Sequence, residues 1–216
     1  MKKSLKIILI AITLTSLAAC TAPSQRKKNI ARFILQHPVA ALAIGMKSPD
    51  AENITSNAVR FSTNVGFADN ELPNGRGTQV NALRHTLWQA TIASRFGADT
   101  ARQVGDAYER DSNALQQHQD RFDILYKADE SIDLNNNAIG RKLGEAHPNI
   151  GMKEMARKIL AYDNQLGLWK ATAHEDENGK PYWTIAPRKM SDADYQKALS
   201  LLEQLDCNGK PLKQNT

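Results

Sequence analysis

The residues of this chain whose types and spacing could do chemistry begin with a cluster at positions 81–88. It contains Asn81, Arg84, His85 and Trp88. At about 100° per residue, these four side chains fall on one stripe of a helix. A histidine in this setting can act as a general acid or base, while the arginine and the amide can bind an anionic or carbonyl oxygen.

Acidic and amide side chains form two further clusters. Asp106 and Glu109 lie one helical turn apart, and Asp133 is followed within four residues by three asparagines, among them Asn136. As a hypothesis, one of these acidic groups orients His85 in a hydrolytic site. The candidate catalytic residues are therefore His85, Arg84, Glu109 and Asp133, and the candidate substrate-binding residues are Asn81, Trp88, Asp106 and Asn136.

Each cluster also has a structural interpretation. A histidine such as His85 is often a partly buried, hydrogen-bonded core residue, and Asp133 can simply cap a helix. Asp106 has Arg102 and Arg110 four residues away on either side, which is the spacing of an ion-pair ladder on a helix surface. The recurrence of such groups on three consecutive segments favours a functional site, and a buried polar network is the alternative.

Established metal and phosphate motifs are absent from the sequence. The segment Asp133-x-Asn135-x-Asn137 begins like a calcium loop, but Ala138 occupies the position that requires glycine. There is no His-x-x-x-His pair, no glycine-rich phosphate loop, no Gly-x-Ser-x-Gly elbow and no pair of redox cysteines. The sequence therefore identifies no metal and no cofactor.

The first cluster requires a helix over residues 78–97. Thr78 is expected to cap its start, and Gly97 is expected to end it in the left-handed conformation. A second stripe of this helix is apolar or small and predicts a buried face: Val80, Leu83, Leu87, Ala90 and Ser94.

The remaining elements are mostly helical as well. Short aromatic and β-branched runs on either side of Asn178-Gly179 predict a small β-hairpin near residues 168–185. The fold class is therefore mainly α, a single orthogonal or bundle-like helical domain with one hairpin. Other helices are predicted over residues 29–44 with a break at Pro38, 53–66, 99–110, 115–128, 137–146, 152–160 and 191–205.

The N-terminus has the features of a bacterial lipoprotein signal peptide over residues 1–19. A basic segment and an apolar run precede Leu17-Ala-Ala-Cys20, so we expect Cys20 to be lipidated. The expected organisation is a tether over residues 20–28 and one domain over residues 29–216, with its motif core at 74–145. An ordinary secretory signal or an uncleaved anchor is the alternative, although the apolar run is short for a membrane span.

Lipidation would make a membrane the partner of this chain, through the acyl chains on Cys20. By resemblance to Gram-negative sorting signals, Thr21 in place of aspartate disfavours retention at the inner membrane. The expected location is the bacterial cell envelope, lipid-anchored at the periplasmic face of the outer membrane. No sequence feature identifies a protein partner.

Charge and cysteine content exclude other classes of function. The chain carries 28 basic and 23 acidic residues, but seven of the basic residues lie within the first 32 positions, which leaves the folded part near neutral. Nucleic-acid binding is therefore not expected. Cys207 is the only cysteine besides Cys20, so no intramolecular disulfide is expected once Cys20 is lipidated.

The three clusters together resemble a known family. Asn81-x-x-Arg84-His85-x-x-Trp88, Asp106-Ala-Tyr-Glu109 and Asp133-x-x-Asn136-x-x-x-Gly140 are similar to the motifs of an uncharacterised bacterial helical domain, found in lipoproteins and at the C-terminal ends of polymorphic toxins. The resemblance implies an all-helical domain with hydrolytic activity. The family usually has Ala-His-Glu in its second motif, and Tyr108 replaces that histidine here, so a two-histidine mechanism does not carry over.

These observations lead to two functional expectations. The first is an envelope lipoprotein with a hydrolase-like polar cleft that acts on a lipid or another envelope ester or phosphoester. The second is a non-catalytic envelope lipoprotein in which the same side chains form a structural network or a binding site.

Overall fold

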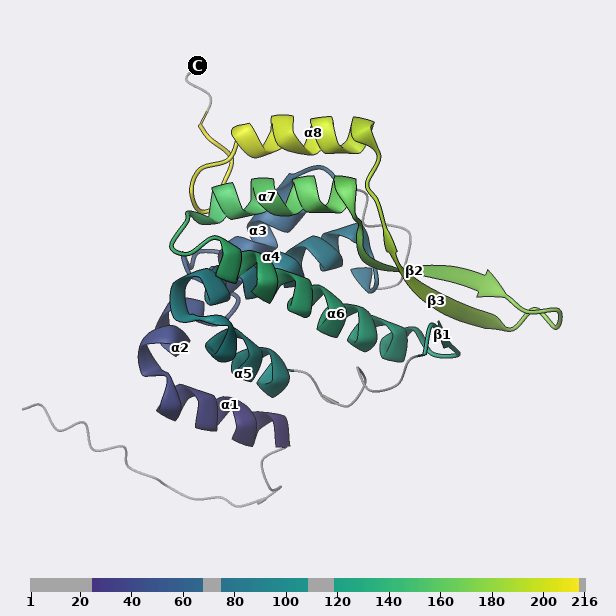
Figure 1. Ribbon diagram of the computed structural model, residues 1–216, viewed down its shortest axis with the longest axis horizontal. Helices are drawn as coiled ribbons and strands as arrows, with labels where there is room; N and C mark the ends of the chain where they lie inside the picture. Colours follow the sequence, from purple (N-terminus) through teal and green to yellow (C-terminus); the bar gives the residue numbers. More distant parts are fainter. Residues whose placement is uncertain (1–24, 68–74, 109–118, 214–216) are drawn as a thin grey trace, which may run out of the picture.

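The computed structural model describes residues 25–67, 75–108 and 119–213, and these residues form a mainly α-helical domain with one small antiparallel sheet (Figure 1). The helices of the described part are α1 (Gln25–Gln36), α2 (Pro38–Ile44), α3 (Ile54–Asn64), α4 (Gln79–Phe96), α5 (Ala98–Tyr108), α6 (Leu125–Ala146), α7 (Met152–Gln165) and α8 (Asp192–Glu203). The strands are β1 (Arg121–Phe122), β2 (Leu168–Glu175) and β3 (Pro181–Arg188).

Helix α4 is the central element, and it packs against α3, α5, α6 and α7 (Figure 1). The Thr78 side chain caps it by accepting a hydrogen bond from the Asn81 backbone nitrogen at 3.3 Å, as predicted. All five residues of the predicted apolar stripe are buried. The predicted left-handed end is wrong, because Gly97 combines a φ of 87° with an extended ψ of 154°. The chain therefore leaves the helix abruptly and enters α5 directly.

The backbones of α4 and α6 approach each other closely where α6 carries two glycines. A Cβ atom on Gly140 would lie 2.4 Å from the carbonyl oxygen of Thr86, and one on Gly144 would lie 2.3 Å from that of Ala90. No side chain fits at either position without moving a helix backbone. This contact sets the distance between the polar side chains of the two helices.

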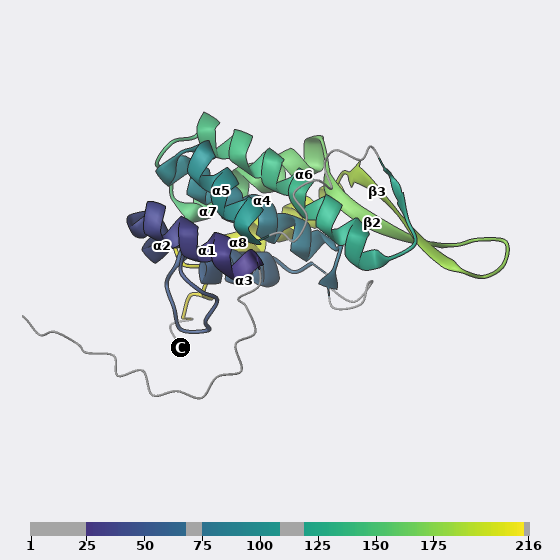
Figure 2. The ribbon, with the colours of Figure 1, turned by 90° about the horizontal axis from the view of Figure 1, so that it is seen from below.

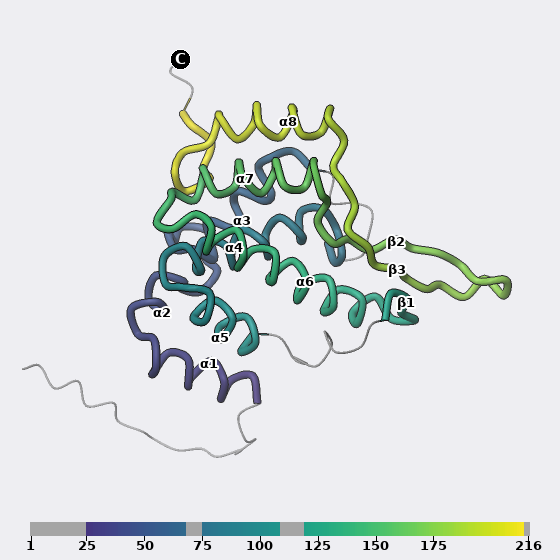
Figure 3. The backbone as a smooth tube through the Cα atoms, in the orientation of Figure 1, coloured from purple at the N-terminus to yellow at the C-terminus, as the bar shows by residue number. Residues whose placement is uncertain are grey.

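The prediction of two helices separated by a loop around Asp133 is wrong. Residues 125–146 form one uninterrupted helix, α6, which Figure 3 traces along its whole length. Residues 121–122, expected to be helical, form strand β1 instead. Asp133 lies in the middle of α6, so it is not a helix cap.

The predicted hairpin is confirmed and is longer than expected. Strands β2 and β3 pair antiparallel from Leu168 with Arg188 to Glu175 with Pro181, and the short β1 adds to β3. Gly179 has a φ of 74°, which the turn requires. The hairpin projects away from the helices in both views (Figures 1 and 2).

The other helix boundaries follow their local signals. Pro38 begins α2, and the side chains of Asn53 and Ser191 cap α3 and α8 by accepting backbone N–H groups at 2.8 Å and 3.1 Å. Helix α1 begins at Gln25, inside the segment expected to be a tether. Within the described residues, no helix is both long and apolar enough to cross a membrane. The predicted signal peptide and Cys20 lie outside the described residues.

Candidate functional site

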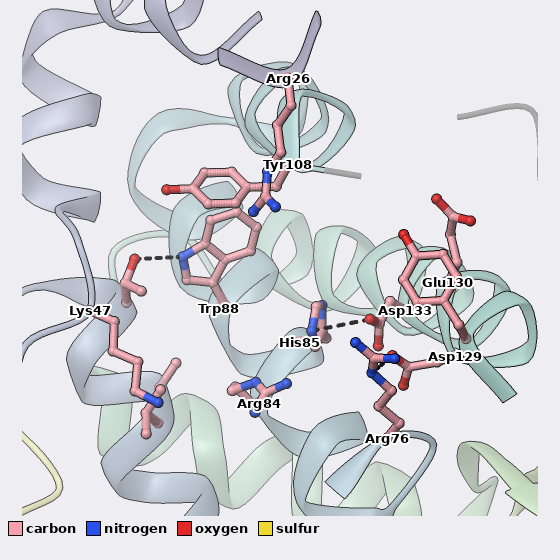
Figure 4. Close-up of a pocket in the computed structure, with 14 residues that line it drawn as sticks. Arg26, Lys47, Arg76, Arg84, His85, Trp88, Tyr108, Asp129, Glu130 and Asp133 are labelled. Atoms are coloured by element: carbon pink, nitrogen blue, oxygen red, sulfur yellow. Dashed lines mark hydrogen bonds and ion pairs between the residues drawn. The ribbon is translucent and has the colours of Figure 1, made fainter. Parts of the chain in front are cut away.

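A cleft of about 480 Å³ opens beside the polar stripe of α4 (Figure 4). Its walls come from α1, α3, α4, α5 and α6 and from the segments that precede α3 and α4. The charged and aromatic residues of its lining are the cations Arg26, Lys47, Arg76 and Arg84, the acidic residues Asp129, Glu130 and Asp133, and His85, Trp88, Tyr108 and Tyr126.

His85 and Asp133 meet on the wall of this cleft. His85 Nε2 on α4 lies 3.4 Å from Asp133 Oδ2 on α6, and Figure 4 shows the two side chains pointing toward each other. Their side chains are 18% and 10% exposed, so both are mostly buried and still reach the cleft. The structure thus brings together a predicted base and a predicted orienting group.

Asn81 forms hydrogen bonds with both aspartates of α6, Asp129 and Asp133. Its Nδ2 donates to Asp129 Oδ1 at 3.0 Å and to Asp133 Oδ1 at 2.8 Å, and its Oδ1 accepts a hydrogen bond from the Arg84 guanidinium. Asn81 is only 1% exposed and is not part of the cleft lining. It was expected to bind substrate, but its position makes it a residue that orients the acidic pair.

The segment before α4 is fixed to Asp129. The Gly77 backbone nitrogen donates to Asp129 Oδ1 at 2.8 Å, and Arg76 Nε lies 3.7 Å from Asp129 Oδ2. Gly77 has a φ of 68°, and a Cβ there would lie 2.6 Å from the Ala171 Cβ, so only glycine fits. Burial raises the pKa of Asp129, while the Gly77 hydrogen bond and the nearby guanidinium groups act in the opposite direction.

His85 is neutral at neutral pH. Burial is the main cause that lowers its pKa and the positive charge of Arg84 is the second, and together they bring the pKa to about 3. The contact with Asp133 is therefore not an ion pair, although its length would allow one. His85 Nδ1 and both amide atoms of Asn137 are buried without a hydrogen-bond partner. Nε2 is the ring nitrogen that contacts a carboxylate, that of Asp133.

The stability of the domain is expected to fall as the pH drops from 6.5 towards 3. In this range the unfolded chain binds a proton at His85 and the folded chain does not, so acid favours unfolding. Between pH 7 and pH 5 the expected loss is about 2 kcal/mol from this residue. Urea denaturation at both pH values should therefore show a smaller drop for His85→Gln than for the wild type. An equal drop in the two proteins would contradict the low pKa.

Aromatic side chains cover the other end of the cleft. Trp88 Nε1 donates to Thr55 Oγ1 at 3.1 Å, and the Trp88 ring meets the Tyr108 ring edge-on with centroids 5.4 Å apart. The Arg26 guanidinium lies over the Tyr108 ring at 5.2 Å. In Figure 4, Tyr108 lies beside Trp88 rather than beside His85. Tyr108 therefore contributes an aromatic wall to the cleft.

Other predicted site residues lie away from the cleft or outside the described chain. Asn136 is fully buried, and its amide pairs with the backbone of Trp169 on β2, at 2.9 Å and 3.0 Å. Asp106 is exposed on α5 and is not part of the cleft lining. Glu109 lies outside the described residues. Asn136 therefore joins α6 to the sheet.

Several cleft residues were missed at the level of sequence. Asp129 and Asp133 are four residues apart, which is one turn of a helix, but an expected loop separated them. Arg76 stands between two glycines in the segment before α4, and a loop of this kind can either line a site or merely connect two helices. Arg26 and Lys47 carry no local signal, since only the packing of α1 and α2 brings them to the cleft.

The histidine and the carboxylates of the cleft are the side chains that could ligate a metal ion. The described residues contain no group of three or more His, Cys, Asp or Glu side chains placed to hold a metal ion. Asp129, Asp133 and His85 are instead engaged with Asn81, Gly77 and one another.

Comparisons with known proteins give one match. A family model described as a domain of unknown function (DUF6973) matches residues 31–165. The matched range runs from within α1 to the end of α7 and contains all cleft residues except Arg26. No curated protein and no solved structure matches the chain.

Proposed function

The chain belongs to this family of domains of unknown function, and we propose that its cleft is the active site of a hydrolase for anionic phosphoesters. The observation that carries the proposal is the contact between His85 and Asp133, 3.4 Å apart, in a cleft that four cationic side chains line. A proton acceptor next to groups that bind phosphoryl oxygens is the arrangement that phosphoester hydrolysis needs.

The charge of the lining favours a phosphoester over a neutral ester. A carbonyl ester needs one or two N–H donors for its developing oxyanion. Four cations exceed that need, although three carboxylates share the lining, and guanidinium groups such as those of Arg76 and Arg84 match the geometry of a phosphate. The aromatic wall of Trp88 and Tyr108 gives an apolar surface for the rest of the substrate. A phospholipid or another envelope phosphoester combines these two chemistries.

The proposed reaction uses the neutral form of His85. Its Nε2 takes a proton from a water molecule as the water oxygen forms a bond to phosphorus. Asp133, whose Oδ2 lies 3.4 Å from this nitrogen, then stabilises the positive charge of the protonated ring. The bond from phosphorus to the ester oxygen then breaks, and that oxygen takes the proton from His85. An anion bound at Arg84 offsets the charge that lowers the pKa of His85, so substrate binding strengthens the base.

An Arg84→Gln variant tests the anionic nature of the substrate. It is expected to raise KM for bis(4-nitrophenyl) phosphate by about 10- to 100-fold, because a hydrogen bond between charged groups is lost. Arg157→Gln is the matched control, since Arg157 pairs with Glu154 and Glu203 away from the cleft. An unchanged KM in Arg84→Gln, or faster hydrolysis of 4-nitrophenyl butyrate than of the phosphodiester, would contradict the proposal.

A non-catalytic role is the second candidate. The observation in its favour is the hydrogen bonding of Asn81 to both Asp129 and Asp133, because such a buried network can serve stability alone. In that case, variants of His85 and Asp133 lose stability without any hydrolytic activity to lose.

The location of the protein is proposed from the sequence. The signal peptide features and Cys20 support a lipoprotein of the bacterial envelope, anchored at the periplasmic face of the outer membrane. A phospholipid substrate is consistent with that location. The membrane would be the partner through the acyl chains on Cys20.

A further inference from the structure

Helices α1 and α2 and the residues directly after α2 expose a group of large apolar side chains that we name the α1–α2 surface. In the described part of the chain eight large apolar side chains are exposed, and five of them lie between residues 34 and 46. These five are Ile34, Leu35, Val39, Leu42 and Met46, and three of them are at least 80% exposed. Such a concentration marks an interaction surface rather than scattered exposure.

These side chains lie on the sides of the two helices that face away from the core. Phe33 on α1 and Ala40 and Ile44 on α2 face the core and are buried, so each helix already has a packed side. Val39 and Leu42 share the opposite side of α2 at i and i+3. Both helices lie at the edge of the domain opposite α8 (Figure 1).

The segment that carries the α1–α2 surface contains charges of a single sign. Residues 25–49 contain five basic residues and no acidic residue, which equals the formal net charge of +5 of the whole chain. On α1, Lys28, Arg32 and Leu35 follow one another at helical spacing, and all three are exposed. Cations beside an exposed apolar stripe are the pattern of a helix that lies in a membrane interface.

We infer that the α1–α2 surface is a second, non-covalent membrane contact, which inserts its apolar side chains among the lipids of an anionic bilayer. A bilayer supplies both the negative charge and the apolar interior that this surface matches. A second copy of the same surface would bring like charges together, which disfavours self-association. The inference depends neither on the chemistry proposed for the cleft nor on the acylation of Cys20.

Two cations of the cleft lining belong to the same part of the chain. Arg26 on α1 and Lys47, which follows α2, both line the cleft and flank the α1–α2 surface in sequence. Contact with a bilayer would therefore bring the cleft close to the lipid head groups.

Site-specific fluorescence in the full-length chain tests the membrane contact. With Cys20 and Cys207 replaced by serine, a single cysteine is introduced as Leu35→Cys, Leu42→Cys or, as the control, Leu166→Cys, and labelled with the polarity-sensitive dye NBD. Leu166 is 61% exposed and ends α7, away from α1 and α2. Because the N-terminal segment is common to all variants, differences between positions report on the surface itself.

Vesicles of equal parts phosphatidylglycerol and phosphatidylcholine are expected to shift the NBD emission to the blue at positions 35 and 42 and not at 166. The shift should disappear with pure phosphatidylcholine vesicles, and adding Lys28→Glu and Arg32→Glu should remove it with anionic vesicles. No shift at positions 35 and 42, or an equal shift at 166, would overturn the inference. A shift that grows with protein concentration without vesicles would also overturn it and assign the surface to a second copy of the chain.

Discussion

A Gly144→Ala variant is expected to lose about 3 kcal/mol of unfolding free energy, because the new methyl group has no space between α6 and α4. Its Cβ would lie 2.3 Å from the Ala90 carbonyl oxygen, 2.6 Å from the Ala93 Cβ and 2.9 Å from the Ser94 backbone nitrogen. Two of these three atoms belong to the backbone of α4, so no rotamer change can relieve the contact. The helices must move apart.

Whether Gly144→Ala lowers or raises the unfolding free energy distinguishes an effect of packing from an effect of helix propensity. Alanine is favoured over glycine inside a helix by about 1 kcal/mol, so propensity alone would make Gly144→Ala stabilising. Gly151→Ala is the control, because a Cβ there meets nothing within 4 Å. Urea denaturation followed by circular dichroism should show a large loss for Gly144→Ala and a change of about 0.5 kcal/mol or less for Gly151→Ala. Increased stability of Gly144→Ala would contradict the close packing of α4 and α6.

The same packing positions the candidate site. Asn81 and His85 on α4 reach Asp129 and Asp133 on α6 only because the two backbones are close. We therefore attribute to Gly140 and Gly144 a role in site geometry, although neither glycine lines the cleft. A variant that separates the helices should lengthen the contact between His85 and Asp133.

The central helix could be predicted from the sequence because its signals are local. Thr78 and Gly97 mark the ends of α4, and its apolar and polar stripes have the period of a helix. The hairpin was equally accessible, since Asn178-Gly179 specifies a tight turn between two strand-like runs. In these elements, local preference and tertiary structure agree.

The middle of helix α6 could not be predicted because its partners are distant in sequence. Asp129, Asp133, Asn136 and Asn137 have the composition of caps and turns, which favours a loop when each is considered alone. In the structure, Asn81 on α4 and the backbone of β2 satisfy three of these four side chains. Those groups lie 33 to 52 residues away, so no window of local sequence contains them.

The cleft contains both predicted and unpredicted residues, because some of its contacts join segments that are distant in sequence. Arg84, His85, Trp88 and Asp133 were expected and line it together. Asp129 was concealed by the expected loop. Asn136 was expected in the site, but its amide pairs with the backbone of Trp169 on β2 instead.

The proton-transfer role of His85 and Asp133 predicts a large effect on catalysis. His85→Gln and Asp133→Asn keep similar shapes and hydrogen-bonding groups, but each removes one half of the pair. Each is expected to lower kcat/KM for bis(4-nitrophenyl) phosphate by about 10²- to 10⁴-fold, the range of general acid–base catalysis. His174→Gln is the matched control, because His174 lies on β2 and bonds to Thr184 at 2.8 Å, away from the cleft.

The most direct measurement is a double-mutant cycle of kcat/KM with His85→Gln, Asp133→Asn and the variant that carries both, in protein shown to be folded by circular dichroism. If His85 and Asp133 act as one unit, the double variant should be about as impaired as either single variant. Folded single variants that keep the wild-type kcat/KM, losses that multiply in the double variant, or a wild-type chain without phosphoester hydrolysis would contradict the proposed mechanism.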